Sequence, residues 1–213
     1  MIIKITLRDQ IKTLLIQKMR EGKLVAGQSL SLAGLARELD VSVTPIREAL
    51  TQLQQVNIIE AIPNKGFIIK NISKEEAINL YQLIATIEAL AVQNSTFKTS
   101  TIKDLKKQES KLRLLEDGLE RINADIKFHD ILISDYDSEI AKQILSDLKT
   151  RIFFYELEFM KSKHFFSDSN NHHEIIINHI ENNQLIEAAE IVKDNWLQIL
   201  KFINNETESH TIF

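Results

Sequence analysis

Four polar side chains interrupt the apolar faces of helices expected in the second half of the chain. Asp125 and His129 are four residues apart, so one helix places them on the same face, with Cβ atoms about 5–6 Å apart. His173 and Asn195 interrupt isoleucine- and alanine-rich stripes of two later helices. A carboxylate, two imidazoles and an amide oxygen suit Zn, Ni, Mn or Fe, and these ligand types do not choose among the four metals. The pattern fits equally a hydrogen-bonded Asp125–His129 pair beside a buried His173.

Short hydroxyl and basic residues mark a second candidate site, in the first part of the chain. Ser42 and Thr44 lie where a short helix is expected to begin, and the exposed N–H groups of a helix N-terminus bind phosphate. Arg47, one turn later, can reach a phosphate or the O6 and N7 atoms of guanine. These residues favour contact with DNA, although Arg47 could instead pair with Glu48 or Glu38 on the protein surface.

Three helices and a hairpin are expected to position these residues. The expected helices are one with apolar residues at helical spacing from Leu7 to Met19, one at about 32–39 capped by Ser31, and one at about 45–55. Two β-branched runs then flank residues 63–66, which predicts a two-stranded hairpin with Lys65 and Gly66 at its tip, beside the DNA. This order is that of a winged helix-turn-helix, whose second helix enters the major groove.

The rest of the chain is expected to form an antiparallel bundle of about six helices. Ser73 and Glu76 form a capping-box pattern that opens a helix running to about residue 95. The later helices are expected at about 101–117, 119–136, 138–163, 169–182 and 184–205, with Thr101, Ser138 and Asn183 as caps. We therefore expect a mainly α protein with two domains, a DNA-binding domain at 1–72 and a helical domain at 73–213.

Composition and charge exclude several classes of protein. The 213 residues include no cysteine, so disulfides, thiolate zinc sites and cysteine nucleophiles are excluded. No apolar run is long enough for a membrane span, and the N-terminus lacks the features of a secretory signal, which together predict a cytoplasmic protein. Residues 1–72 hold 10 basic and 6 acidic residues, whereas the remainder holds 16 and 24. The net charge is thus +4 before residue 73 and −8 after it, as expected if only the first part meets a polyanion.

The run LARELDVSVTPIREAL, followed by PNKGFII, resembles the DNA-binding domain of the GntR family of bacterial transcription regulators. The resemblance covers about residues 5–70 and implies that Ser42, Thr44, Arg47 and the wing residues Lys65 and Gly66 contact DNA. Two positions depart from the family pattern, because Val43 and Ala33 stand where the family often has basic residues. These departures imply a different operator sequence or affinity.

Residues 73–205 are similar to the FCD domain, the C-terminal effector domain of the FadR subfamily. The segments NLYQLIATIEALAV, DIKFHDILI and HEIIINHIENNQLIEAAEIVKDNW carry this resemblance. The metal ligands of metal-binding members are one Asp and three His, and they fall on Asp125, His129, His173 and Asn195, so that Asn replaces the third His. The arginine of the opening motif is Ile84 here, which implies the loss of a charged group beside the effector.

These observations together predict a sequence-specific regulator rather than an enzyme. We expect a homodimeric repressor that binds double-stranded operator DNA and whose DNA affinity changes when a small organic acid binds the helical domain. Two alternatives stay open, a metal-dependent enzyme that uses Asp125, His129 and His173, and a DNA-bound scaffold without an effector.

Overall fold

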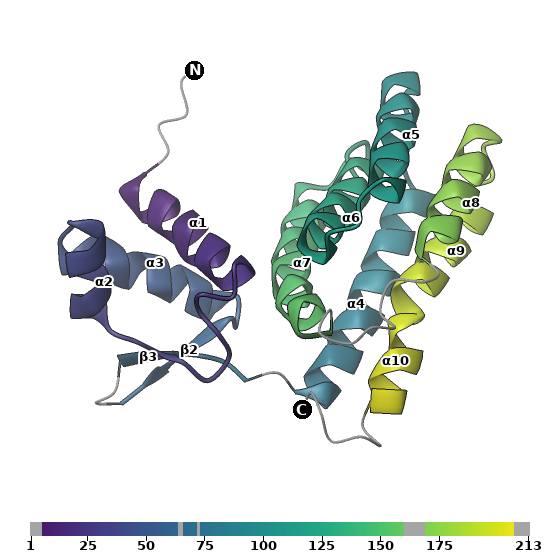
Figure 1. Ribbon diagram of the computed structural model, residues 1–213. Coiled ribbons are helices and arrows are strands. Elements are labelled where there is room, and N and C mark those ends of the chain that lie inside the picture. Colours follow the sequence, from purple (N-terminus) through teal and green to yellow (C-terminus); the bar gives the residue numbers. More distant parts are fainter. Residues whose placement is uncertain (1–5, 64–65, 72, 160–168, 207–213) are drawn as a thin grey trace. The chain divides into compact units, whose positions relative to one another are not determined.

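The computed structural model describes residues 6–63, 66–71, 73–159 and 169–206 (Figure 1). Its contacts divide the chain into two compact units, residues 1–72 and 73–213. Within the described residues, no helix is long and apolar enough to cross a membrane. Each unit has a core of its own, so each is described by itself.

The N-terminal unit places three helices on a small sheet. Its elements are α1 Leu7–Arg20, β1 Ser29–Leu30, α2 Leu32–Leu39, α3 Val43–Gln55, β2 Ile59–Ile62 and β3 Gly66–Ile69. The hydroxyl of Ser31 accepts a hydrogen bond from the Gly34 N–H at 3.1 Å, so the predicted cap of α2 is present. The helix ends at Leu39, and its C-cap Asp40 has a left-handed φ of 52°. Helix α3 begins two residues earlier than the sequence suggested.

The inner faces of α1 and α3 supply most of this core. Ile11 and Leu15 of α1 are buried with Ile46, Leu50 and Leu53 of α3. The buried residues of α3 lie three or four positions apart and so form one face of the helix. The opposite face, which carries Thr44 and Arg47, stays exposed.

The sheet has three antiparallel strands in the order β1-β3-β2, where two had been expected. The predicted hairpin forms, with Ile59 opposite Ile69 and Ile62 opposite Gly66. The additional strand, Ser29–Leu30, pairs with the other edge of β3. Two residues are too short for an alternating pattern to be recognised, which is why the sequence did not reveal this strand.

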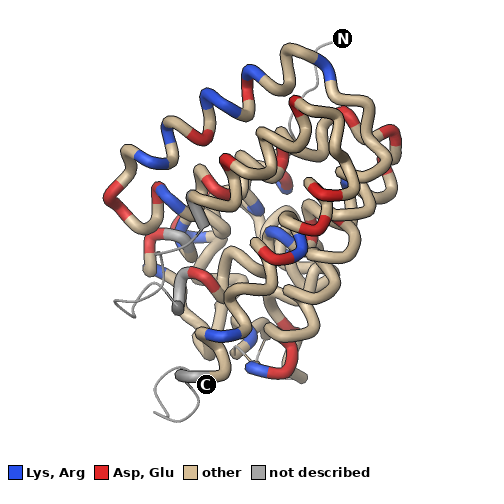
Figure 2. The backbone as a smooth tube through the Cα atoms, turned by 90° about the vertical axis from the view of Figure 1, so that its right-hand side faces the viewer, with Lys and Arg blue, Asp and Glu red and all other residues tan. Residues whose placement is uncertain are grey.

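The C-terminal unit is entirely helical in its described residues. Its elements are α4 Lys74–Gln93, α5 Thr99–Arg113, α6 Gly118–Leu132, α7 Glu139–Phe159, α8 Ser169–Glu181, α9 Leu185–Leu197 and α10 Ile199–Glu206. Helix α4 lies in the middle, in contact with α7, α9 and α10 (Figure 1). Figure 2 shows basic and acidic residues interspersed along the helices that face the viewer.

Helix ends differ from the sequence-based prediction in four places. Helix α6 ends at Leu132 instead of continuing to 136, and the expected helix at 184–205 is divided into α9 and α10 at Gln198. Thr101 does not cap α5 but is buried within it, and Lys98 holds the N-cap position. The expected cap Asn183 instead lies one residue before the N-cap of α9, in left-handed backbone. Ser73 and Ser138 do accept hydrogen bonds from the first turns of α4 and α7.

Candidate DNA-reading face and metal centre

The N-terminus of α3 presents short polar side chains to solvent. Ser42 is the N-cap residue, yet its hydroxyl makes no capping hydrogen bond, and both Ser42 and Thr44 are exposed. The first N–H groups of α3 therefore have no side-chain cap from this residue. The free N–H groups of such an N-terminus can donate hydrogen bonds to a phosphate oxygen.

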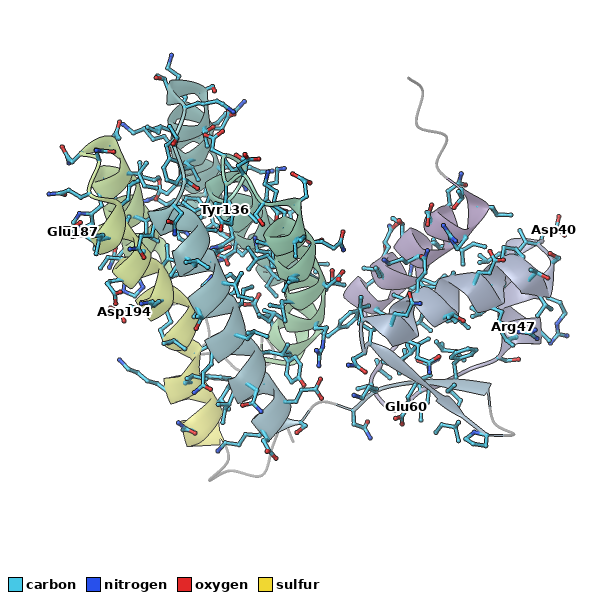
Figure 3. All side chains as sticks on the ribbon, turned by 180° about the vertical axis from the view of Figure 1, so that it is seen from behind. Asp40, Arg47, Glu60, Tyr136, Glu187 and Asp194 are labelled. Atoms are coloured by element: carbon cyan, nitrogen blue, oxygen red, sulfur yellow. The ribbon has the colours of Figure 1, made fainter. Side chains whose placement is uncertain are left out.

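Arg47 projects from the outer edge of the N-terminal unit (Figure 3). Neither Glu48 nor Glu38 pairs with it in the structure, since Glu38 forms its ion pair with Lys18. Among the described residues, Arg47 takes part in no ion pair. Its guanidinium is thus left without a protein carboxylate.

Of the two predicted DNA contacts in the β2–β3 hairpin, Lys65 and Gly66, the structure describes Gly66. Gly66 begins β3 with a φ of 86°, a backbone conformation that favours glycine, and it is exposed. Lys65 lies outside the described residues.

Three of the four predicted metal ligands meet inside the helical unit. One ligand atom from each of Asp125, His129 and His173 lies within 4.8 Å of the other two. The Asp125 carboxylate is 3.7 Å from His129 Nε2 and 3.4 Å from His173 Nε2. Both imidazoles are fully buried, whereas the Asp125 side chain is 21% exposed. Helices α6 and α8 together therefore bring the three groups to one point.

The two histidine nitrogens that face Asp125 make no hydrogen bond within the described residues. His129 Nε2 and His173 Nε2 are both buried, and their neighbour is the Asp125 carboxylate at 3.7 and 3.4 Å. Burial lowers the pKa of His173 to about 4, so its imidazole stays neutral, the form that binds a metal. The neutral imidazole of His173, the second imidazole of His129 and a carboxylate are ligand types that fit a divalent transition metal.

A buried carboxylate holds the other side of the His129 ring. Glu88 Oε2 lies 2.5 Å from His129 Nδ1 and also accepts a hydrogen bond from Trp196 Nε1. Glu88 is fully buried, and burial opposes its ionisation, yet the neighbouring His129 and Lys149 lower its pKa to about 2. An ionised Glu88 accepts a hydrogen bond from the Nδ1–H of His129, so Nε2 is the ring nitrogen that faces Asp125.

Comparison with known proteins supports both parts of this arrangement. Residues 7–69 match the model of the bacterial regulatory proteins of the gntR family, and residues 79–196 match that of the FCD domain. The chain belongs to the GntR family. It is a transcription regulator with an N-terminal DNA-binding domain and a C-terminal effector-binding FCD domain.

Two relatives illustrate the similarity. The HTH-type transcriptional regulator McbR of Escherichia coli K12 is 27% identical over 200 residues, which are 89% of this chain and 85% of McbR. The Nta operon transcriptional regulator of Aminobacter aminovorans is 28% identical over 133 residues, 60% of this chain and 63% of that protein.

Solved structures show the same fold. McbR/YncC of E. coli superposes with a TM-score of 0.78 at 22% identity, covering 96% of this chain and all of that one. A putative GntR regulator from Rhodococcus sp. RHA1 also gives a TM-score of 0.78, at 19% identity, over 93% and 97% of the two chains.

The fourth predicted ligand of the FCD domain, Asn195, lies on α9 directly before Trp196. It is buried, and its amide nitrogen has no partner among the described residues. Rotation of the amide group by 180° would place the oxygen at this buried position. The amide of Asn195 therefore has a polar atom without a hydrogen bond among the described residues, on the same helix whose Trp196 bonds to Glu88.

Sequence reasoning missed Glu88 and Lys149. Lys149 of α7 is 3.1 Å from both Glu88 Oε1 and Asp130 Oδ1, and its side chain is almost completely buried. The signal for Glu88 was available, because it shares a helical face with the buried residues Ile84, Ala85 and Val92. A single charge on such a face needs a partner, and here it has three.

A second buried acid faces the same interior. Glu156 of α7 is buried, and Tyr81 of α4 donates a hydrogen bond to it at 3.5 Å. Burial, reinforced by the charge of Asp125, raises the pKa of Glu156 well above its usual value and so favours its neutral form. Ile84, where the family motif has an arginine, is fully buried.

Proposed function

We propose that this chain is a repressor that binds a palindromic operator through α3 and the wing. The observation that carries the proposal is the exposed face of α3, where Arg47 has no carboxylate partner among the described residues and the first turn keeps N–H groups for phosphate. Ser42, Thr44, Arg47, Gly66 and Lys65 are the proposed contacts. Arg47 can form two hydrogen bonds with a guanine, and such a pair contributes about 1–3 kcal/mol of discrimination.

A gel-shift titration of Arg47→Ala tests the DNA-binding face. The operator is first selected with the full-length protein from a random duplex library. We expect the variant to bind this operator roughly 5- to 150-fold more weakly. Lys103→Ala is the matched control, because it removes one positive charge from an exposed position of α5. Equal affinities of Arg47→Ala and the unchanged protein would remove Arg47 from the contacts.

We infer that the FCD domain binds a divalent transition metal through Asp125, His129 and His173. The buried Nε2 atoms of both histidines, which make no hydrogen bond within the described residues, support this site, and Asn195 is the proposed fourth ligand. The metal would supply a Lewis acid that holds an oxygen of the effector. An amide oxygen in place of a third imidazole leaves two nitrogen and two oxygen ligands, a set that does not choose among Zn, Ni, Mn and Fe.

Metal analysis of protein purified without chelator tests the site. We expect about one equivalent of metal, and its loss in His173→Ala. His179→Ala is the matched control, since His179 is a half-buried histidine of the same helix that lies outside the cluster and pairs with Gln184. If His173→Ala retains the metal, the metal binds at another place in the protein. If the purified protein contains no metal and has no affinity for Zn, Ni, Mn or Fe, the cluster is only a hydrogen-bonded group.

A small organic acid is the proposed effector, with its carboxylate on the metal. The neutral form of Glu156 supports this choice, because an uncharged acid does not repel an incoming carboxylate. Effector binding must favour one arrangement of the two DNA-binding domains to change DNA affinity, typically by about 1–3 kcal/mol.

We propose that the regulator acts as a homodimer in the cytoplasm and catalyses no reaction. A palindromic operator requires two copies of α3, one for each half-site. Leu83 and Leu90 of α4, about half exposed, form with Ile87 an apolar stripe that a second copy would cover. Turnover of small organic acids by the metal-loaded protein would instead favour an enzyme.

A further inference from the structure

Val43 is an apolar side chain in the middle of the proposed DNA-reading face. It is the first residue of α3 and is 37% exposed, between the exposed residues Ser42 and Thr44. The core of the N-terminal unit is supplied by other positions of α3, such as Ile46 and Leu50, so Val43 is not needed there. The exposed part of this branched apolar side chain is therefore available to a partner outside the unit.

The chemistry of the major groove limits what that partner is. Base edges present hydrogen-bond donors and acceptors, together with one apolar group, the C5 methyl of thymine. The valine side chain has neither donor nor acceptor, so in the groove it gains free energy only by burying apolar surface. Residues at the N-terminus of a recognition helix are the ones that reach base edges.

We propose that Val43 determines specificity by packing its methyl groups against the C5 methyl of a thymine in each operator half-site. The proposal rests on the proposed function, since it requires α3 to enter the major groove.

The position of Arg47 adds a constraint on that thymine. Val43 and Arg47 are four residues apart on α3 and so are neighbours on its surface. Their separation along the helix is about 6 Å, roughly two base-pair steps of 3.4 Å. The thymine therefore lies within about two base pairs of the position that Arg47 contacts.

Uracil substitution tests the contact without changing base pairing. The operator is selected from a random duplex library with the full-length protein, and each thymine of one half-site is then replaced singly by uracil, which lacks only the methyl group. We expect one position at which uracil weakens binding of the unchanged protein about three- to tenfold.

Variants assign that effect to a side chain. Val43→Ala shortens the apolar side chain and should reduce the preference for thymine over uracil, whereas Val43→Ile should keep that preference. Thr44→Ser removes the neighbouring methyl group and should keep the preference too. Val25→Ala is the matched control, because Val25 is an exposed valine of the same unit that lies outside α3.

The outcomes separate this inference from the function on which it rests. The role of Val43 is overturned if no uracil replacement weakens binding, or if the replacement weakens binding of Val43→Ala as much as that of the unchanged protein. Neither result contradicts sequence-specific DNA binding. A uracil effect that disappears in Thr44→Ser assigns the methyl contact to Thr44 and also overturns the inference. If no sequence is enriched from the library, sequence-specific DNA binding itself is contradicted, and the role of Val43 is overturned with it.

Discussion

Substitution of Glu88 should show that this residue orients His129 for metal binding. Its carboxylate accepts a hydrogen bond from the Nδ1–H of His129 and thereby fixes the orientation of the ring. Glu88→Gln keeps the shape of the side chain but removes the charge, and outer-shell changes of this kind typically cost about 10- to 100-fold in metal affinity. The fluorescence of Trp196, the single tryptophan, reports the binding, because its ring centroid is 4.3 Å from that of His129.

The outcome that contradicts this role is a Glu88→Gln protein with unchanged metal affinity. Glu174→Gln is the control, since Glu174 is an exposed residue of α8 that pairs with Arg113. Its metal affinity should match that of the unchanged protein.

The buried His173 also makes stability depend on pH once the metal is removed. Its pKa is about 4 in the folded protein against a usual value of 6.5, because burial disfavours the charged form. Between these pH values the unfolded chain binds more protons, so the free energy of unfolding falls as the pH is lowered from about 6.5 to 4. The loss attributable to His173 is about 3 kcal/mol. Urea unfolding of chelator-treated protein measures it.

Replacement of the imidazole provides the comparison for this pH dependence. His173→Gln should show a weaker fall in stability over the same pH range, whereas His179→Gln should follow the unchanged protein. A His173→Gln protein with the full pH dependence would show that other groups cause it.

At the scale of elements, the ion pair between Lys149 and Glu88 should join α7 to α4. Both side chains are almost completely buried, and Lys149 also reaches Asp130 of α6. Lys149→Met leaves the Glu88 charge with one partner fewer in the interior, and breaking a buried pair in this way typically costs about 3–5 kcal/mol of unfolding free energy. Chemical denaturation followed by circular dichroism of the helices measures the change.

Helix α7 itself offers the control for this substitution. Lys142 forms an ion pair with Glu139, which is 90% exposed, so Lys142→Met should change stability by no more than about 0.5 kcal/mol. Equal effects of the two substitutions would mean that the buried pair does not hold the helices together.

Elements could be predicted from the sequence wherever one local signal was strong. Periodic apolar residues located the helices, and a turn at 63–66 between β-branched runs located the hairpin. The strand Ser29–Leu30 depends on pairing with β3, a contact that no local pattern records. Asp125 and His129 were recognisable because i,i+4 spacing is local, whereas the meeting of Glu88, His129 and Lys149 depends on how three helices pack.

At the scale of the whole molecule, the proposed dimer should depend on the stripe of Leu83, Ile87 and Leu90. These residues recur at the spacing of one helical face of α4, on the side left exposed among the described residues. Leu90→Lys places a charge where a second copy would bury apolar surface, so we expect a monomer in light scattering at concentrations where the unchanged protein is a dimer. Because operator half-sites lie about 34–36 Å apart, the monomer should occupy one half-site only and bind the full operator at least about 10-fold more weakly. Leu114→Lys, at an 82% exposed leucine beyond α5, should remain dimeric, and a dimeric Leu90→Lys protein would place the interface elsewhere.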